Sequence, residues 1–357
     1  MKYIFSALFV LILSSGISKA QQSGRVFEFL SLPPTAKVAS LGGLASPDLD
    51  LDPGMALLFS SQLDSLMHNH VSLNFTDHVS DIHYGNVSYI RDYSRVGTFA
   101  AIINYISYGN IMETDEFGWD MGEFSPLELS LGVAWGKKLA DYLSIGSQIK
   151  FISSSFHSYN ATGLAADISL SYRNPEHNFL ISAMVRNAGR QITYYHGTSE
   201  PLPLDVMIGF SKKLNNAPLR FSIVANNLHR YDLKFKEQKP QFPSDVEETP
   251  ETTADRILDI GDNLLRHLTI GLEILPVKNF NLRVGYNYRR RQELGHEGRM
   301  STVGISWGIG VRISKFEFNY GRSHFHLAGS QNHISIGTNI DRFKSNRRTP
   351  DQGLSNF

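Results

Sequence analysis

Three consecutive segments within residues 268–314 alternate apolar and polar side chains with almost no interruption. In each segment one set is large and branched or aromatic, and the other contains glycine, serine, asparagine and charged residues. The apolar sets are Leu268, Ile270, Leu272, Ile274; Phe280, Leu282, Val284, Tyr286, Tyr288; and Val303, Ile305, Trp307, Ile309, Val311, Ile313. Because successive side chains of an extended chain point to opposite sides, this period of two predicts three β-strands with one apolar and one polar face.

The length of these segments favours a membrane-spanning barrel over a soluble sheet. Strands of soluble sandwiches usually have about five or six residues. A strand tilted about 45° across a bilayer needs roughly 9–11 residues, with lipid on one side and a polar lumen on the other. We therefore expect lipid to cover the apolar face. The alternative is a large soluble β protein that buries the same face between two sheets.

The same alternation recurs along the chain and predicts an all-β, antiparallel transmembrane barrel of about fourteen strands. The predicted strands start near Val71, Ile82, Arg95, Leu127, Leu143, Gly163, Asn178, Leu204, Leu219, Leu268, Phe280, Ser301, Phe316 and Asn332. In the second of them the alternation breaks, which predicts a β-bulge or a shifted boundary.

The connections between the predicted strands alternate in length. Those after even-numbered strands are tight, whereas most of those after odd-numbered strands are longer, including one over residues 324–331. Bacterial barrels have short periplasmic turns and longer outer loops. We therefore expect residues 71–343 to form an even-stranded barrel with both ends in the periplasm, followed by a C-terminal tail over residues 344–357.

The first twenty residues have the pattern of a secretory signal peptide. Lys2 precedes an apolar run over residues 4–13, and small residues lead to Ala20, after which we expect cleavage. No later stretch approaches the ~18 uninterrupted apolar residues of a transmembrane helix. An exported chain of this kind crosses a membrane only as a closed barrel, because lipid offers no partner to an unpaired backbone group.

Two regions fall outside the predicted wall. Residues 21–70 lack sustained alternation, and we expect them to form a hatch folded into or against the lumen; the alternative is a periplasmic leader. Residues 232–267 form one long extracellular insertion, whose second half has the apolar spacing of a short amphipathic helix. Insertions of this length are usually functional or disordered, so this one is either a contact surface or a solvated cap.

Composition argues against several classes of function. The chain has 34 basic and 34 acidic residues and no cysteine. The balance of charge argues against a nucleic-acid surface, and the missing thiols exclude disulfides, thiol catalysis and thiolate metal sites.

Catalytic and ligand motifs are sparse. Ser147 and Lys150 match a Ser-x-x-Lys pattern, but strand alternation places Ser147 toward lipid and Lys150 in the lumen. The pairs His68 with His70 and His324 with His326 could share a strand face, yet they lack a third ligand at a set spacing. We expect no enzyme activity, no cofactor and no metal site.

Charged residues on the polar face must be paired if the lumen is plugged, because an isolated charge out of water is costly. We expect salt bridges between wall and plug, with a selectivity ring in an open pore as the alternative. The residues concerned are Glu273, Arg283, Arg289, Arg312 and Glu317.

The N-terminal segment carries a resemblance to a known family. It reads FLSLPPTAKVASLGG over residues 29–43 and DPGMALL over residues 52–58. This resembles the mature start of the PorV/PorQ outer-membrane family of the type IX secretion system, which belongs with the FadL-like fourteen-stranded barrels. In that family an Asn-Pro-Ala motif stands where this chain has Asp52-Pro53-Gly54. Length and the single large insertion look more like PorQ than PorV.

The resemblance implies a non-enzymatic component of the surface attachment complex, in the outer membrane of a Gram-negative, Bacteroidetes-like bacterium. It implies a PorZ-like surface protein as partner, with sortase or PorV-like components as further neighbours. Within the insertion we expect apolar residues to make the contact, namely Phe235, Phe242, Ile257 and Leu258; in the hatch the turn is Leu41, Gly42 and Gly43. The alternative function is a FadL-like transporter for hydrophobic small molecules, with a movable hatch.

Overall fold

A computed structural model describes residues 24–44, 47–50, 52–234, 253–294, 302–326 and 329–344. The predicted signal peptide and residues 345–357 of the predicted tail lie outside these ranges. No helix in the described ranges is long and apolar enough to cross a membrane.

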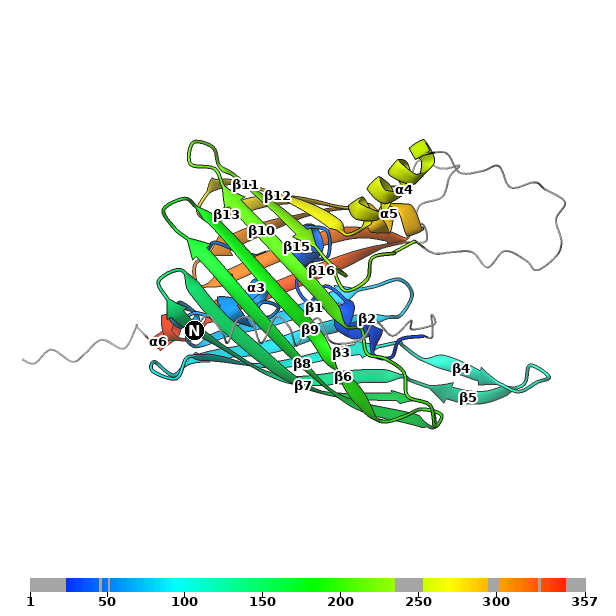
Figure 1. Ribbon diagram of the computed structural model, residues 1–357. Helices are drawn as coiled ribbons and strands as arrows, with labels where there is room; N and C mark the ends of the chain where they lie inside the picture. Colours follow the sequence, from blue (N-terminus) through cyan, green and yellow to red (C-terminus); the bar gives the residue numbers. More distant parts are fainter. Residues whose placement is uncertain are drawn as a thin grey trace, which may run out of the picture.

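Fourteen antiparallel strands of the described chain close into one barrel, as the alternation predicts (Figure 1). Their order follows the sequence, and the first strand pairs with the last. The strands are β1 (His70–Asp77), β2 (His83–Asp92), β3 (Thr98–Ser107), β6 (Leu127–Ala140), β7 (Leu143–Phe156), β8 (Tyr159–Asn174), β9 (Phe179–Thr193), β10 (Asp205–Lys213), β11 (Leu219–Ala225), β12 (Leu268–Val277), β13 (Phe280–Asn287), β14 (Ile305–Ile313), β15 (Phe316–His326) and β16 (Gly329–Asn339). Between β3 and β6, β4 (Ile111–Thr114) and β5 (Asp120–Phe124) form a separate hairpin.

The two faces of the wall differ in exposure as the sequence pattern requires. Ile149 and Ile168 face outward and are 66% and 61% exposed, while their neighbours Lys150 and Asp167 face inward and are buried. Closure of the sheet pairs the backbone of every barrel strand on both sides, which a lipid environment demands. The apolar outer face and the closed sheet together make this an outer-membrane barrel.

The described residues of 24–69, which we call the plug, fold inside the barrel (Figure 1). Their short helices are η1 (Glu28–Ser31), α2 (Ala36–Ser40), α3 (Pro53–Ala56), η2 (Ser60–Gln62) and η3 (Ser65–Met67). Helix α2 contacts β13 to β16, and η2 contacts β6 to β8. The segment that the sequence assigns to a hatch therefore touches opposite sides of the wall.

Glycines on the inner face of the wall let the plug backbone approach closely. A Cβ atom built on Gly285 would lie 2.2 Å from the backbone nitrogen of Gly42, and one on Gly146 would lie 2.2 Å from the carbonyl carbon of Ser60. Only a residue without a side chain fits at such contacts. Plug packing thus accounts for some of the glycines of the polar face.

Strand β2 pairs with β1 and β3 in unbroken register, so the predicted bulge is wrong. Tyr84 and Ile90 are apolar but face inward, where both are buried. Ile90 packs with Ala56, Leu57 and other apolar plug residues. The alternation breaks because this part of the lumen is filled by an apolar surface rather than by water.

Strand β13 ends at Asn287, earlier than the alternation predicts, and residues Tyr288–Leu294 form helix α5. The side chain of Asn287 caps this helix by accepting a hydrogen bond from the amide of Arg290 at 2.9 Å. Arg289 therefore leaves the wall and pairs with Glu293 on the same helix at 2.8 Å. Its predicted position in the lumen is wrong.

The two ends of the barrel differ. Helices α4 (Thr253–Arg266) and α5 and the β4–β5 hairpin lie at one end, while helix α6 (Asp341–Lys344) lies at the other (Figure 1). Tight turns such as 141–142, 278–279 and 314–315 share the α6 end. Since short turns are periplasmic in bacterial barrels, α4, α5 and the hairpin face outward from the cell. The connection expected over 324–331 is shorter, because β15 reaches His326 and β16 starts at Gly329.

The lipid-facing interpretation predicts a depth-dependent cost for a buried charge. Leu131 lies outward in the middle of β6 and Leu139 lies outward near its periplasmic end, and both are exposed. We expect Leu131→Arg to lower the free energy of unfolding by about 2–4 kcal/mol and Leu139→Arg by about 1 kcal/mol or less. Urea unfolding in lipid vesicles measures both values. Equal losses would contradict lipid contact at Leu131.

Candidate functional site

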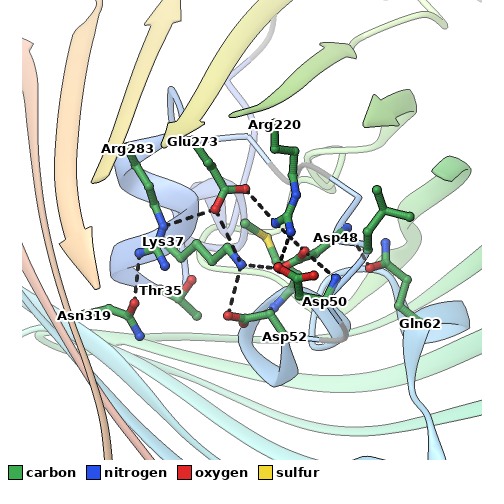
Figure 2. A network of polar contacts seen from close by, with 12 residues as sticks. Thr35, Lys37, Asp48, Asp50, Asp52, Gln62, Arg220, Glu273, Arg283 and Asn319 are labelled. Carbon is green, nitrogen blue, oxygen red and sulfur yellow. Dashed lines mark hydrogen bonds and ion pairs between the residues drawn. The ribbon is translucent and has the colours of Figure 1, made fainter. Parts of the chain in front are cut away.

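A buried lysine ties the plug to itself and to the wall. Lys37 on α2 forms ion pairs with Asp48, with Asp52 at 3.2 Å and with Glu273 at 3.9 Å (Figure 2). Asp48 and Asp52 belong to the plug, whereas Glu273 projects inward from β12. One ammonium group thus links two turns of the plug to the barrel.

A buried arginine makes the second link. Arg220 on β11 donates hydrogen bonds to Asp48 at 2.7 Å and to Glu273 at 3.1 Å, and it also pairs with Asp50 (Figure 2). Arg283 on β13 reaches Glu273 at 3.5 Å. We call Lys37, Asp48, Asp50, Asp52, Arg220, Glu273 and Arg283 the plug lock.

Local structure explains how the plug presents its part of the lock. Thr35 accepts a hydrogen bond from the amide of Val38 at 3.2 Å and so caps α2, which places Lys37 in the first turn of that helix. Asp52 caps α3 by accepting from the amide of Met55 at 3.2 Å. Proline at the first position of α3 fixes the backbone there.

Strand register explains how the wall brings its three charged residues of the lock together. Arg220 is directly opposite Glu273 in the β11–β12 pairing, and Glu273 is directly opposite Arg283 in the β12–β13 pairing. Opposite charges at paired positions lie close enough to interact. The expected salt bridge between wall and plug is confirmed for Glu273, which pairs with Lys37. Arg283 pairs with Glu273, and Arg312 pairs with Glu317, so these bridges lie within the wall instead.

Burial makes each charge of the lock depend on the others. Arg220 is 1% exposed, Asp48 2% and Glu273 3%. Such charges are stable out of water only when they are paired, and removal of one partner leaves the other uncompensated. The lock therefore favours one position of the plug, and breaking any of its buried pairs is costly.

The surroundings shift the pKa values of the two plug residues at the centre of the lock. Burial alone lowers the pKa of Lys37, but the carboxylates of Asp48, Asp52 and Glu273 outweigh it and raise that pKa above its ordinary value. Burial alone raises the pKa of Asp48, but Arg220 and Lys37 outweigh it and lower that pKa below its ordinary value. Both residues are therefore charged at neutral pH.

The predicted hatch turn lies at the end of α2, against the wall. Leu41 is buried, and Gly42 and Gly43 have φ angles of +100° and +84°. The amide of Gly43 donates to the carbonyl of Val38 at 3.0 Å, which closes the end of the helix. The side-chain amide of Asn287 donates to the carbonyl of Gly42 at 3.2 Å and ties the turn to β13.

Of the predicted partner-binding residues, Leu258 is the one whose side chain the structure describes, and it is 70% exposed. Phe235 and Phe242 lie outside the described residues, and so does the side chain of Ile257. Leu258 lies on α4, the amphipathic helix that the sequence predicts in this insertion.

Helix α4 is attached through its polar face. Asp262 accepts a hydrogen bond from the hydroxyl of Tyr288 at 2.7 Å and pairs with Lys234 at 3.2 Å. Asn263 accepts from the amide of Leu233 at 3.0 Å. The apolar face is consequently left outward, with Leu258, Ile260, Leu264 and Leu265 exposed.

Sequence reasoning missed a second apolar surface, on the β4–β5 hairpin. Phe117 and Trp119 at its tip are 85% and 72% exposed, and Met112 and Met121 are also exposed. Alternation could not reveal it, because the hairpin lies outside the barrel wall. The signal available was the presence of large apolar residues within a polar connection.

The structure places the members of two other sequence motifs apart from each other. Ser147 and Lys150 face opposite sides of β7, and Lys150 pairs with Asp167 at 2.6 Å. His68 precedes β1, so it does not share a strand with His70. Among the described residues, no group of three or more histidine or acidic side chains is placed to hold a metal ion.

No protein-family model and no curated protein matches this chain. Solved barrels match its fold at low identity. A TodX monoaromatic hydrocarbon channel with a ΔS2 mutation matches with a TM-score of 0.50 and 13% identity, over 86% of this chain and 97% of that one. The Pseudomonas putida toluene transporter TodX matches with a TM-score of 0.49 and 13% identity, over 88% and 98%. A Pseudomonas aeruginosa FadL homologue matches with a TM-score of 0.46 and 10% identity, over 86% and 98%. The chain thus shares the barrel fold of the TodX channel with the ΔS2 mutation, and at 13% identity this likeness concerns the fold alone.

The lock predicts a large cost for removing Arg220. Arg220→Met leaves Asp48, Asp50 and Glu273 short of a positive partner, and we expect it to lower the free energy of unfolding by about 3–5 kcal/mol. Arg289→Met breaks an exposed pair on α5 and should cost about 1 kcal/mol or less. Denaturant unfolding in lipid vesicles compares the two. A cost at Arg220 no larger than at Arg289 would show that the lock is not needed.

The lock also predicts a pH window. A lowered pKa at Asp48 stabilises the fold above the ordinary value of 3.8, and this contribution is lost as the pH falls below it. A raised pKa at Lys37 stabilises the fold below the ordinary value of 10.5 and is lost as the pH rises above it. We expect the denaturant concentration at the midpoint of unfolding to stay constant across neutral pH and to decrease in acid. Asp48→Asn should be less stable at neutral pH and show a shallower acid loss; an unchanged acid slope would rule out this role of Asp48.

Proposed function

We propose that the chain is a non-enzymatic outer-membrane scaffold that docks a protein partner on its outer loops. The resemblance of residues 29–58 to the PorV/PorQ family makes that partner a PorZ-like surface protein and the assembly a type IX surface attachment complex. The single observation that carries the docking role is the outward apolar face of α4, because the polar face of this helix is already used to hold it to the barrel.

Helix α4 and the β4–β5 hairpin expose large apolar side chains that water does not favour. On α4, Leu258, Leu264 and Leu265 are 70%, 57% and 46% exposed and lie along one side of the helix. Contiguous apolar surface on a folded protein commonly marks an interaction site. The β4–β5 hairpin adds Phe117 and Trp119 at the same end of the barrel, and aromatic residues are enriched in the buried centres of protein interfaces.

The closed lumen also supports docking over conduction. The plug spans the lumen from β6–β8 on one side to β13–β16 on the other, and the lock holds it there. A barrel whose interior is fixed in this way offers its outer elements, rather than a water-filled hole, to other molecules.

A FadL-like transporter for hydrophobic small molecules is the second candidate. The TodX barrel that shares the fold is a monoaromatic hydrocarbon channel, and this comparison favours the transporter over the scaffold. A small cavity of about 60 Å³ between plug and wall is the space such a molecule would enter. Its lining combines apolar Leu57, Leu58 and Ile102 with charged Lys150, Asp167 and Arg186. Its size is well below that of ordinary ligand pockets, which hold about 300–1,000 Å³.

Substitution of the outer apolar residues tests the scaffold. We expect Leu258→Ser with Leu264→Ser, or Phe117→Ser with Trp119→Ser, to reduce recovery of the PorZ-like partner at least tenfold in copurification from crosslinked outer membranes. The matched control is Leu139→Ser with Val277→Ser, which removes two exposed apolar groups at the periplasmic end.

Toluene uptake into vesicles containing the purified barrel provides the opposing measurement. Partner recovery that is unchanged in both outer variants would contradict the scaffold. Saturable toluene uptake by the wild-type barrel, together with unchanged partner recovery, would establish the transporter instead.

A further inference from the structure

A polar cavity of about 680 Å³ lies between the plug and the periplasmic end of the barrel. The β12–β13 turn contributes Lys278 and Asn279 to its lining, and helix α6 contributes Arg342. These elements share the end with short turns, so the cavity is reached from the periplasm. Its volume falls within the range of about 300–1,000 Å³ that is usual for ligand sites.

The lining carries an excess of positive charge. Seven basic side chains and four carboxylates line the cavity, a difference of three positive charges. The basic side chains are Lys37, Lys213, Arg220, Lys278, Arg283, Arg312 and Arg342, and the carboxylates are Asp50, Asp52, Glu273 and Glu317. Asp48 lies behind Lys37 and Arg220, and the balance stays positive when it is included.

Ion pairs account for the carboxylates but not for all of the cations. Asp50, Asp52 and Glu273 belong to the lock, and Glu317 pairs with Arg312 at 2.5 Å. Among the described residues, Lys213, Lys278 and Arg342 have no carboxylate within ion-pair distance. Three uncompensated cations therefore surround the periplasmic part of the cavity.

We propose that this cavity binds a soluble periplasmic anion through carboxylate or phosphate oxygens, with Lys213, Lys278 and Arg342 as its main contacts. Charge-assisted hydrogen bonds from lysine and arginine are the strongest that such oxygens receive. The lining does not suit a neutral hydrocarbon, because its charged groups would lose water without gaining partners. The inner wall of the cavity is the lock itself, so a bound anion lies next to the residues that hold the plug.

Calorimetric titration of the full-length barrel in zwitterionic detergent at low salt tests this site. The probes are citrate and inorganic phosphate, with dihexanoyl phosphatidylglycerol to identify a lipid headgroup as the source of the anion. We expect saturable binding of citrate or phosphate, and at least a tenfold loss of affinity in Lys213→Gln with Lys278→Gln and Arg342→Gln.

A matched variant separates a site from general attraction. Lys137→Gln with Lys138→Gln and Lys212→Gln removes the same charge from the same end of the barrel, outside the cavity, and should keep wild-type affinity. Glu317→Gln should strengthen binding, because it releases Arg312 from its carboxylate. This second variant tests the proposal even if the triple variant fails to fold, as judged by heat-modifiable migration on a gel.

Any of the following results would overturn the proposal. An equal loss in the matched control would mean nonspecific attraction, and a loss in Glu317→Gln would mean that net charge does not govern the cavity. The absence of saturable heat with both soluble probes would mean that no soluble anion binds. Binding of the phosphatidylglycerol probe alone would replace the soluble anion with a lipid headgroup.

Discussion

The pairing of buried charges between plug and wall is the constraint on which the rest of this structure depends. Closing a sheet in lipid satisfies its backbone but leaves an interior lined by alternate side chains. In this chain three of those side chains, Arg220, Glu273 and Arg283, form a charged row across neighbouring strands. The row is completed by Lys37 and Asp48 from a segment far away in the sequence, so the barrel and its plug are stable in one relative position.

Close backbone packing supports that position. Glycines of the inner wall receive the plug at the turn after α2 and at η2, where a Cβ atom would collide with plug backbone. An apolar cluster that includes Val26, Phe27, Ile106 and Ile152 fills another part of the lumen. Charge, backbone contact and apolar packing thus act at different places on one plug, and what is left for recognition lies at the two ends of the barrel.

Local alternation predicted the wall well, because lipid on one side and a polar lumen on the other impose a period of two on every strand. It failed where another surface replaced water or lipid. Ile90 faces inward because the plug is apolar there, and Arg289 left the wall because α5 begins at Tyr288. The charges Glu273 and Arg283 were identified from their alternation, but Lys37, the plug partner of Glu273, was not. A contact between residues so distant in sequence leaves no periodic signal.

On the outer surface, too, the sequence predicted some features and only the structure revealed others. The amphipathic pattern of α4 was readable, yet only the structure shows that its polar face contacts Tyr288 and Lys234 and that its apolar face is outward. The β4–β5 hairpin could not be recognised from alternation, since its aromatic tip is shaped by neither lipid nor lumen. Recognition surfaces at both ends therefore had to be found from exposure and charge.

Conductance across a planar lipid bilayer tests the closed, locked barrel most directly. The account predicts that the wild-type barrel carries no steady ion current and that a variant without residues 24–69 opens a stable pore. A wild-type current equal to that of the variant would contradict it, because the plug would then neither fill the lumen nor be held in place.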